Sequence, residues 1–189
     1  MAIVERTALA DLRSDPVWTD RYERVRDLIE RAADAGPVAV YHVGSTAVED
    51  LAGRPALDVI AVYRDAEAMT AAAEALAAED GYELSHEGES RAVVVRWVEV
   101  DEEGREAEFL KLHTPGDEQV RSQLAVRDYL RDRPAARREY EAVKREAAAE
   151  HPRGGSEYTA AKSAVVGSLI ERAREAGYYD RLPDAVEPG

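Results

Sequence analysis

Two short apolar runs, joined through a Gly-Ser turn, constrain the fold of this 189-residue chain more than any other stretch. The first run covers residues 38–43 and ends at Gly44-Ser45, and the second run opens at Asp58. Short apolar runs bounded by glycine and small polar residues are typical of buried β-strands. The stretch therefore predicts a strand, a small-residue turn, a short connector and a second strand.

The turn and the aspartate give this stretch its chemistry. Gly44 has no side chain, so the backbone there can approach a ligand closely. Ser45 offers a hydroxyl group, and the backbone N–H groups after it can face an anion if a short helix begins there. Asp58, at the start of the second strand, can hold a hard cation such as Mg²⁺.

The rest of the chain predicts helices and strands in a simple order. A helix is expected over residues 19–35, with Thr19 as its N-cap, because apolar residues recur there at helical spacing. Residues 101–104 are a hairpin-turn signal between two strands. The expected strands cover residues 38–43, 56–63, 82–86, 91–100 and 105–113, and the other expected helices cover residues 65–80, 117–131, 134–150 and 156–176.

This order indicates an α+β fold, with a mixed β-sheet, flanking helices and a C-terminal helical region. We expect residues 1–115 to form an α/β core and residues 116–180 to form a helical region packed on it. Residues 181–189 are expected to be a frayed tail.

The charge of the chain is strongly acidic. There are 39 Asp and Glu residues against 25 Lys and Arg, which gives a net charge of −14, and only three of the basic residues are lysines. Such a surface suits solubility in concentrated salt, so we interpret it as the solvent face of a halophilic protein. It argues against a duplex nucleic-acid partner, which would need a basic patch.

The composition also bounds the chemistry and the location. The chain has no cysteine, which excludes a disulfide framework and thiol catalysis. No apolar run approaches the ~20 residues of a membrane span, and no secretory leader precedes the first expected helix. We therefore expect a cytoplasmic protein with no membrane partner, while the sequence leaves its oligomeric state open.

Several motifs in a fixed order resemble one family. They are His42-Val43-Gly44-Ser45-Thr46-Ala47-Val48 with Arg54-Pro55 and Asp58, then Arg127-Asp128-Tyr129, Tyr140-x-x-Val-Lys144 and Tyr158-x-x-Ala-Lys162. With these motifs the chain resembles the GrpB family of the nucleotidyltransferase superfamily over residues 15–176. The resemblance implies a nucleotidyltransferase-like fold, in which the Gly-Ser turn grips nucleotide phosphates and the aspartate binds a metal ion.

The chain departs from that pattern in the second and fifth expected strands. A second carboxylate normally lies two residues after the aspartate, on the same strand face, but this chain has Ile60. Glu106 and Glu108 are acidic residues that could compensate, although alternation places Glu108 on the face opposite Lys111. GrpB-like chains usually have His-x-His hereabouts, where this chain has Phe109 and Lys111. A metal-ligating pair is therefore expected to be lost, with a cation in its place.

The lysines of the helical region are candidate ligand contacts. Lys144 and Lys162 each follow a tyrosine by four residues, so each Tyr–Lys pair shares a helix face. Where nearly all other cations are arginines, a lysine suggests a site that needs a compact ammonium group. The alternative is that the tyrosines are core residues and the lysines reach its rim. Arg127-Asp128 fits a ligand clamp or a local ion pair, and His42 fits a structural histidine or a ligand contact.

These residues make up one predicted site and leave several functions open. The candidate nucleotide contacts are His42, Gly44, Ser45, Thr46, Arg54, Lys111, Arg127, Lys144, Tyr158 and Lys162, and Asp58 is the candidate catalytic residue and Mg²⁺ ligand. One hypothesis is Mg²⁺-dependent transfer of a nucleotidyl group from an NTP to an unknown acceptor. The alternative is an inactive module that binds a nucleotide or another phosphorylated small molecule. A third hypothesis is an interaction protein with an acidic surface.

Overall fold

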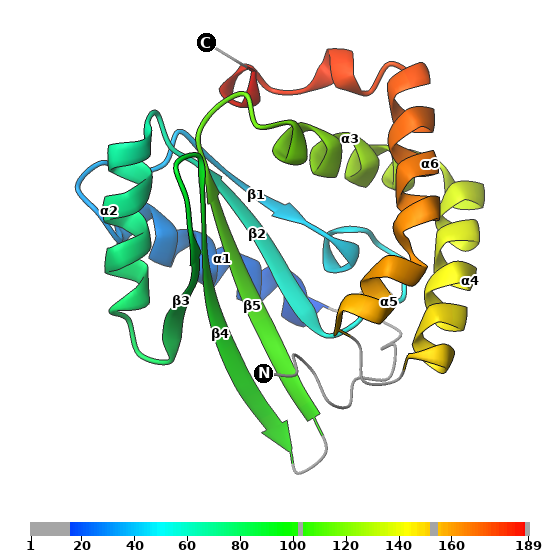
Figure 1. Ribbon diagram of the computed structural model, residues 1–189, viewed down its shortest axis with the longest axis horizontal. Coiled ribbons are helices and arrows are strands. Elements are labelled where there is room, and N and C mark those ends of the chain that lie inside the picture. The colour runs from blue at the N-terminus through cyan, green and yellow to red at the C-terminus, as the bar shows by residue number, and fades with distance from the viewer. Residues whose placement is uncertain (1–15, 102–103, 152–154, 188–189) are drawn as a thin grey trace.

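Five strands form one mixed sheet at the centre of the molecule (Figure 1). They are β1 (Ala39–Val43), β2 (Ala56–Val62), β3 (Tyr82–Glu87), β4 (Arg91–Asp101) and β5 (Gly104–His113). They lie in the order β1-β2-β5-β4-β3, in which β2 and β5 are parallel and the other neighbours are antiparallel. The expected α+β fold with a mixed sheet is therefore confirmed.

The computed structural model describes residues 16–101, 104–151 and 155–187. The middle of the expected hairpin turn, residues 102–103, lies outside the described residues. The strands on either side of it, β4 and β5, pair antiparallel along their length.

Six α-helices are described together with the sheet. They are α1 (Pro16–Arg31), α2 (Ala66–Ala77), α3 (Glu118–Asp132), α4 (Pro134–Glu150), α5 (Gly155–Ala161) and α6 (Ser163–Glu175). Figure 1 shows α2 at one side of the sheet and α3 to α6 gathered at the other side, beyond β1. No described helix combines the length and the apolar character that a membrane span needs.

Strand β2 is buried on both faces, which explains its nearly continuous apolar run. Leu57 and Val59 belong to the core that α1 and α2 complete on one face. Ile60 and Val62 belong to a second core, which α3 covers on the opposite face. Asp58 is the polar side chain of this strand, and it shares the α3 face with Ile60 because side chains alternate along a strand.

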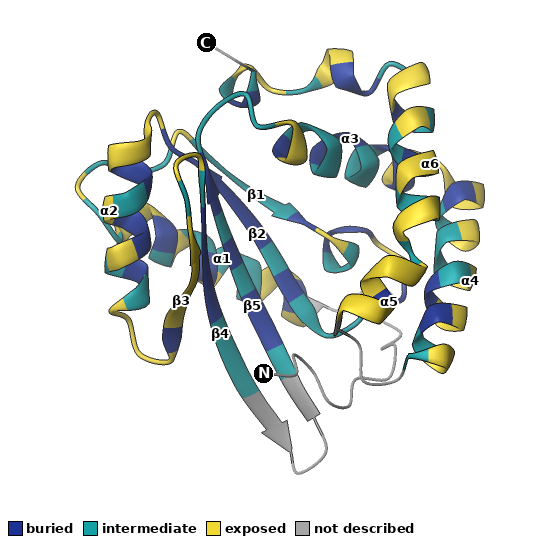
Figure 2. Ribbon diagram, viewed as in Figure 1, coloured by how far each residue is buried: buried dark blue, intermediate teal, exposed yellow. Residues whose placement is uncertain are grey.

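The C-terminal helices have a core of their own, and the connector after β1 takes part in it. Val48 and Leu51 of that connector are buried together with Leu130 of α3 and Leu169 of α6. Figure 2 shows the complementary pattern, with the outward faces of α2, α5 and α6 exposed. The connector is therefore held between the sheet and the helical region.

Some element boundaries differ from the expected ones. The first helix begins at Pro16 and ends at Arg31, so Thr19 lies inside it and is not its N-cap. Proline is favoured in the first helical turn, where its missing N–H costs nothing. The expected single helix over residues 156–176 is two helices, with the break at Lys162.

The expectation of a frayed tail is wrong for residues 181–187. Val186 is only 1% exposed and belongs to the core on the α3 face, with Leu182 packed against that core. The backbone N–H of Gly116 donates to the carbonyl oxygen of Val186. Burial of these two apolar side chains holds the segment in place, and the division into residues 1–115, 116–180 and 181–189 stays a prediction.

Candidate functional site

The Gly-Ser turn follows β1 directly, as expected, and begins a short 3₁₀ turn, η1 (Ser45–Ala47). Gly44 has φ 75° and ψ −168°, a conformation that is essentially restricted to glycine. A Cβ atom at this position would lie 2.5 Å from Oδ2 of Asp58. Glycine is therefore required on two counts, and its backbone lies directly against the Asp58 carboxylate.

Lys144 of α4 reaches this turn from the helical region. Its side chain is buried, with 1% exposure, and its Nζ donates to Ser45 Oγ at 2.6 Å and to the Ala52 carbonyl oxygen at 2.5 Å. The ammonium group also lies 5.2 Å from the centre of the Tyr140 ring. Burial, and then the nearby charge of Lys162, lower the pKa of Lys144 to about 7. Lys144 is thus part of the core and does not reach its rim.

Two residues that the sequence analysis did not single out complete this contact. Glu141, one turn before Lys144, accepts a hydrogen bond from the backbone N–H of Ala52 at 3.2 Å. Gly53 packs so closely that a Cβ atom there would lie 2.5 Å from Ser45 Cβ and 3.3 Å from Lys144 Nζ. The glycine at position 53 was visible in the sequence, but only the fold brings it beside Ser45.

Asp58 forms an ion pair with Lys111, which lies on the same sheet face. Lys111 Nζ is 2.8 Å from Asp58 Oδ1, and it donates to Gln123 Oε1 of α3 at 3.2 Å. Ile60, two residues after Asp58, is completely buried in the core on the α3 face. The only strand carboxylate on this face near the turn, within the described part of the chain, is therefore paired with a cation.

Glu106 and Glu108 do not supply the missing carboxylate. Glu108 is fully buried on the opposite face, where it pairs with Arg24 of α1 and accepts a hydrogen bond from the Tyr82 hydroxyl at 2.5 Å. Glu106 pairs with Arg21 of the same helix. Both glutamates therefore tie β5 to α1 and point away from Asp58.

Lys162, Tyr158 and Arg54 form the far wall of the site. Lys162 Nζ and the Arg54 guanidinium carbon each lie 4.0 Å from the centre of the Tyr158 ring. Burial, and then Arg54, lower the pKa of Lys162 to about 8, whereas Asp58 acts in the opposite direction. Arg54 Nε is buried and has no hydrogen-bond partner among the described residues.

His42, Thr46 and Arg127 brace the turn from its other side. His42 stacks on Tyr22 of α1, and its Nε2 lies 2.9 Å from Thr46 Oγ1. Because the Thr46 hydroxyl donates to the Ala56 carbonyl, its oxygen accepts the Nε2–H of His42. Burial, and then the charge of Arg131, lower the pKa of His42 to about 4. His42 is therefore a neutral, hydrogen-bonded histidine at neutral pH.

Arg127 forms an ion pair with Asp128 and a hydrogen bond with the backbone of β1. Its Nε lies 2.7 Å from Asp128 Oδ1, and its terminal nitrogen donates to the His42 carbonyl oxygen at 3.1 Å. Arg131, one turn later, donates to the Ala47 carbonyl oxygen at 2.8 Å. Both arginines anchor the end of β1 and the turn to α3.

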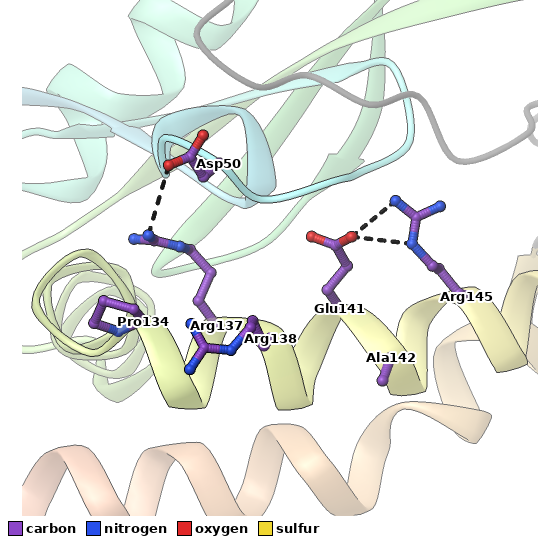
Figure 3. Close-up of a pocket in the computed structure, with 7 residues that line it drawn as sticks. All are labelled: Asp50, Pro134, Arg137, Arg138, Glu141, Ala142 and Arg145. Carbon is purple, nitrogen blue, oxygen red and sulfur yellow. Dashed lines mark hydrogen bonds and ion pairs between the residues drawn. The ribbon is translucent and has the colours of Figure 1, made fainter.

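A pocket of about 470 Å³ lies between α4 and Asp50 of the connector (Figure 3). Its charged side chains are Asp50, Arg137, Arg138, Glu141 and Arg145. Figure 3 shows Asp50 directed at Arg137 and Glu141 directed at Arg145, which compensate two of the arginine charges. The three arginines of this pocket thus exceed its two carboxylates by one charge, and Glu141 also takes part in the contact with the connector.

The side chains around Asp58 do not fit a protein-held Mg²⁺ ion. Mg²⁺ prefers several oxygen ligands in octahedral geometry, and the resemblance implies at least two strand carboxylates. Here Asp58 is paired with Lys111, and position 60 is a buried isoleucine. Across the described residues, no group of three or more Asp, Glu and His side chains is arranged to hold a metal ion.

The chain is similar in sequence to proteins described as GrpB or UPF0157 proteins. A family model described as GrpB protein matches residues 12–172. A UPF0157 protein of Deinococcus radiodurans is 33% identical over 158 residues, which cover 84% of this chain and 78% of that protein. The UPF0157 protein YqkA of Bacillus subtilis is 25% identical over 83% of this chain, which spans 45% of the length of YqkA.

Solved structures share the fold. The crystal structure of conserved protein GrpB from Enterococcus faecalis matches with a TM-score of 0.71 and 23% identity, and covers 87% of this chain and 96% of that chain. A chain of the GLD-2/RNP-8 complex matches with a TM-score of 0.53 and 14% identity, and covers 93% of this chain and 64% of that chain. The mixed sheet with its flanking and C-terminal helices resembles nucleotidyltransferase folds.

Proposed function

The chain belongs to the GrpB family, and we propose that it binds a nucleotide or another phosphorylated small molecule between the Gly44-Ser45 turn and the C-terminal helices. One observation supports this most. All three lysines of a chain with net charge −14 gather around this turn: Lys111, Lys144 and Lys162. Lys111 is paired with Asp58, but Lys144 and Lys162 have no carboxylate ion pair among the described residues, which favours an anionic ligand.

The charges of the cluster do not cancel. Two carboxylates lie near it: Asp58 is paired with Lys111, and Glu141 is paired with Arg145. Within the described residues, Lys144 is bonded to a hydroxyl and a carbonyl oxygen, and Lys162 contacts an aromatic ring. Arg54 adds a third cation beside that ring. Burial lowers the pKa of Lys144 to about 7 and that of Lys162 to about 8, so a bound phosphate group would favour their charged forms and offset the repulsion among these groups.

The donors of the site also suit phosphate oxygens. Ser45 Oγ accepts the Lys144 hydrogen bond, so its own O–H is left to donate to a ligand. Gly44 brings the backbone close without a side chain. The buried Nε–H of Arg54 lacks a partner among the described residues, and a ligand oxygen could satisfy it.

A second candidate function is nucleotidyl transfer, and the position of Asp58 against the Gly44 backbone favours it. In that reaction an acceptor hydroxyl oxygen would bond to the α-phosphorus of an NTP and give its proton to a base such as Asp58, while the bond from the α-phosphorus to the oxygen that bridges to the β-phosphorus breaks and pyrophosphate leaves. Asp58 would be the catalytic carboxylate, and the acceptor would have to draw it away from Lys111. Release of pyrophosphate from an NTP, lost in Asp58→Asn, would distinguish this function from binding alone.

Calorimetric titration with ATP, GTP and inorganic pyrophosphate tests the binding function. Lys162→Ala should weaken binding by roughly 10-fold or more, because it removes a charge-assisted contact. Arg31→Ala is the matched control: it removes an exposed cation from α1 and should leave the affinity unchanged. Equal affinities of the wild-type chain and Lys162→Ala, with unchanged melting temperatures, would contradict the proposed site.

A further inference from the structure

We propose that the ammonium group of Lys111 takes the place of a divalent cation in this site, so that the chain binds phosphate without Mg²⁺. The inference rests on the proposed function and names how its ligand is held. It starts from the mismatch between the side chains around Asp58 and the ligands that Mg²⁺ needs.

The Lys111 ammonium group lies beside the Asp58 carboxylate, where a metal ion bound to that carboxylate would lie. Strands β2 and β5 are parallel, and Lys111 is the register partner of Ile60. Position 60 is where the resemblance places a second carboxylate, and it is sealed by apolar packing. From the neighbouring strand, the Lys111 side chain reaches back to Asp58 and occupies the space beside its carboxylate with a positive charge.

The Lys111 ammonium also has hydrogen-bonding capacity left for a ligand. It carries three N–H donors, of which Asp58 and Gln123 take two among the described residues. The Lys111 and Asp58 side chains are 18% and 24% exposed, so the pair is open to a small molecule. The third N–H is therefore available to a phosphate oxygen, which is the contact that a bridging metal ion would otherwise make.

The first test measures the metal directly, with no phosphate ligand present. Mn²⁺ has ligand preferences like those of Mg²⁺ and is detected by electron paramagnetic resonance. The wild-type chain and Asp58→Asn should bind the same amount of Mn²⁺, because Asp58 is already neutralised by Lys111. A Mn²⁺ ion that the wild-type chain binds and Asp58→Asn loses would overturn the proposal.

The second test measures pyrophosphate binding in EDTA and in Mg²⁺ with wild-type chain and Lys111→Met, a neutral side chain of similar length. The wild-type affinity should differ little between the two buffers, and Lys111→Met should lose about 10-fold or more in both. The proposal is overturned if Mg²⁺ raises wild-type affinity by 10-fold or more, on the order of 1.4 kcal/mol, or if it restores binding to Lys111→Met.

The two tests separate this inference from the proposed function. If the wild-type chain binds pyrophosphate in neither buffer, the phosphate-binding function is wrong. The Mn²⁺ comparison still decides whether Asp58 holds a metal ion or is neutralised by Lys111. Melting temperatures of all variants check that a lost signal does not come from unfolding.

Discussion

Lys144 shows how one residue connects the stability of the fold with its candidate site. Its ammonium group is buried without a carboxylate ion pair among the described residues, and it is held by Ser45 and the Ala52 carbonyl. Burying a charge in this way is costly, which is why its pKa is lowered to about 7 from the ordinary value of 10.5. The nearby carboxylates Glu141 and Asp58 oppose this shift and Lys162 adds to it.

The lowered pKa of Lys144 predicts a pH-dependent stability. Between pH 7 and 10.5 the unfolded chain binds this proton more strongly than the folded chain, so the free energy of unfolding should rise with pH in that window. The contribution is up to about 1.4 kcal/mol per pH unit. Urea unfolding of the wild-type chain and Lys144→Met, followed from about pH 7 to about pH 9, measures it as a difference. A difference that does not change with pH would show that Lys144 titrates normally.

At the scale of elements, helix α4 holds the connector between β1 and β2. Glu141 and Lys144, one turn apart, take both the N–H and the carbonyl of Ala52. The next residue, Gly53, lets the connector pass against Ser45. The turn at the candidate site is therefore shaped by a helix that lies far away in the sequence.

Two glycine-to-alanine substitutions, which we expect to change the unfolding free energy in opposite directions, test this contact. Gly53→Ala puts a methyl group against Ser45 Cβ, which cannot move aside, and should cost about 1–3 kcal/mol of unfolding free energy. Gly167→Ala, in α6, meets no atom within 4 Å and should stabilise the chain by about 0.5–1 kcal/mol. Thermal and urea unfolding measure both, and a neutral Gly53→Ala would show that the connector is loosely held.

The element order was predictable from the sequence because it rests on local patterns. Residues 134–150 were expected as a helix and form α4, whose first residue is a proline. The packing of Val186 was missed because it depends on contacts with distant segments. The break at Lys162 was also missed, because no glycine or proline marks it in the sequence. From the sequence alone, His42 and Arg127 each fitted a structural role and a ligand contact equally well. The structure gives each of them partners within the protein.

The whole molecule combines an acidic surface with a basic site. The net charge is −14, yet all three lysines converge on one turn, where Lys111 pairs with Asp58 and the other two have no carboxylate ion pair among the described residues. Arginines make the other cationic contacts, and many of these are ion pairs on the helix surfaces. The unpaired lysines at the turn favour a site that attracts an anion against the overall charge of the molecule.

The acidic charge predicts that salt stabilises the chain. Repulsion between like charges is screened over about 3 Å at molar ionic strength, so the melting temperature should rise as KCl is increased into the molar range. Each kcal/mol gained should raise it by about 2–4 °C for a chain of this size. A melting temperature that is flat or falls across this range would remove the halophilic interpretation.

The arginine contacts of α3 have a consequence for self-association. Strand β1 is an edge of the sheet, and an edge strand exposes carbonyl groups that can pair with a strand from another molecule. Here Arg127 donates a hydrogen bond to the His42 carbonyl oxygen, and Arg131 donates one to the Ala47 carbonyl oxygen just beyond it. An incoming strand would first have to break charge-assisted hydrogen bonds. The helix thus hinders pairing of another strand with the β1 edge while it positions the turn.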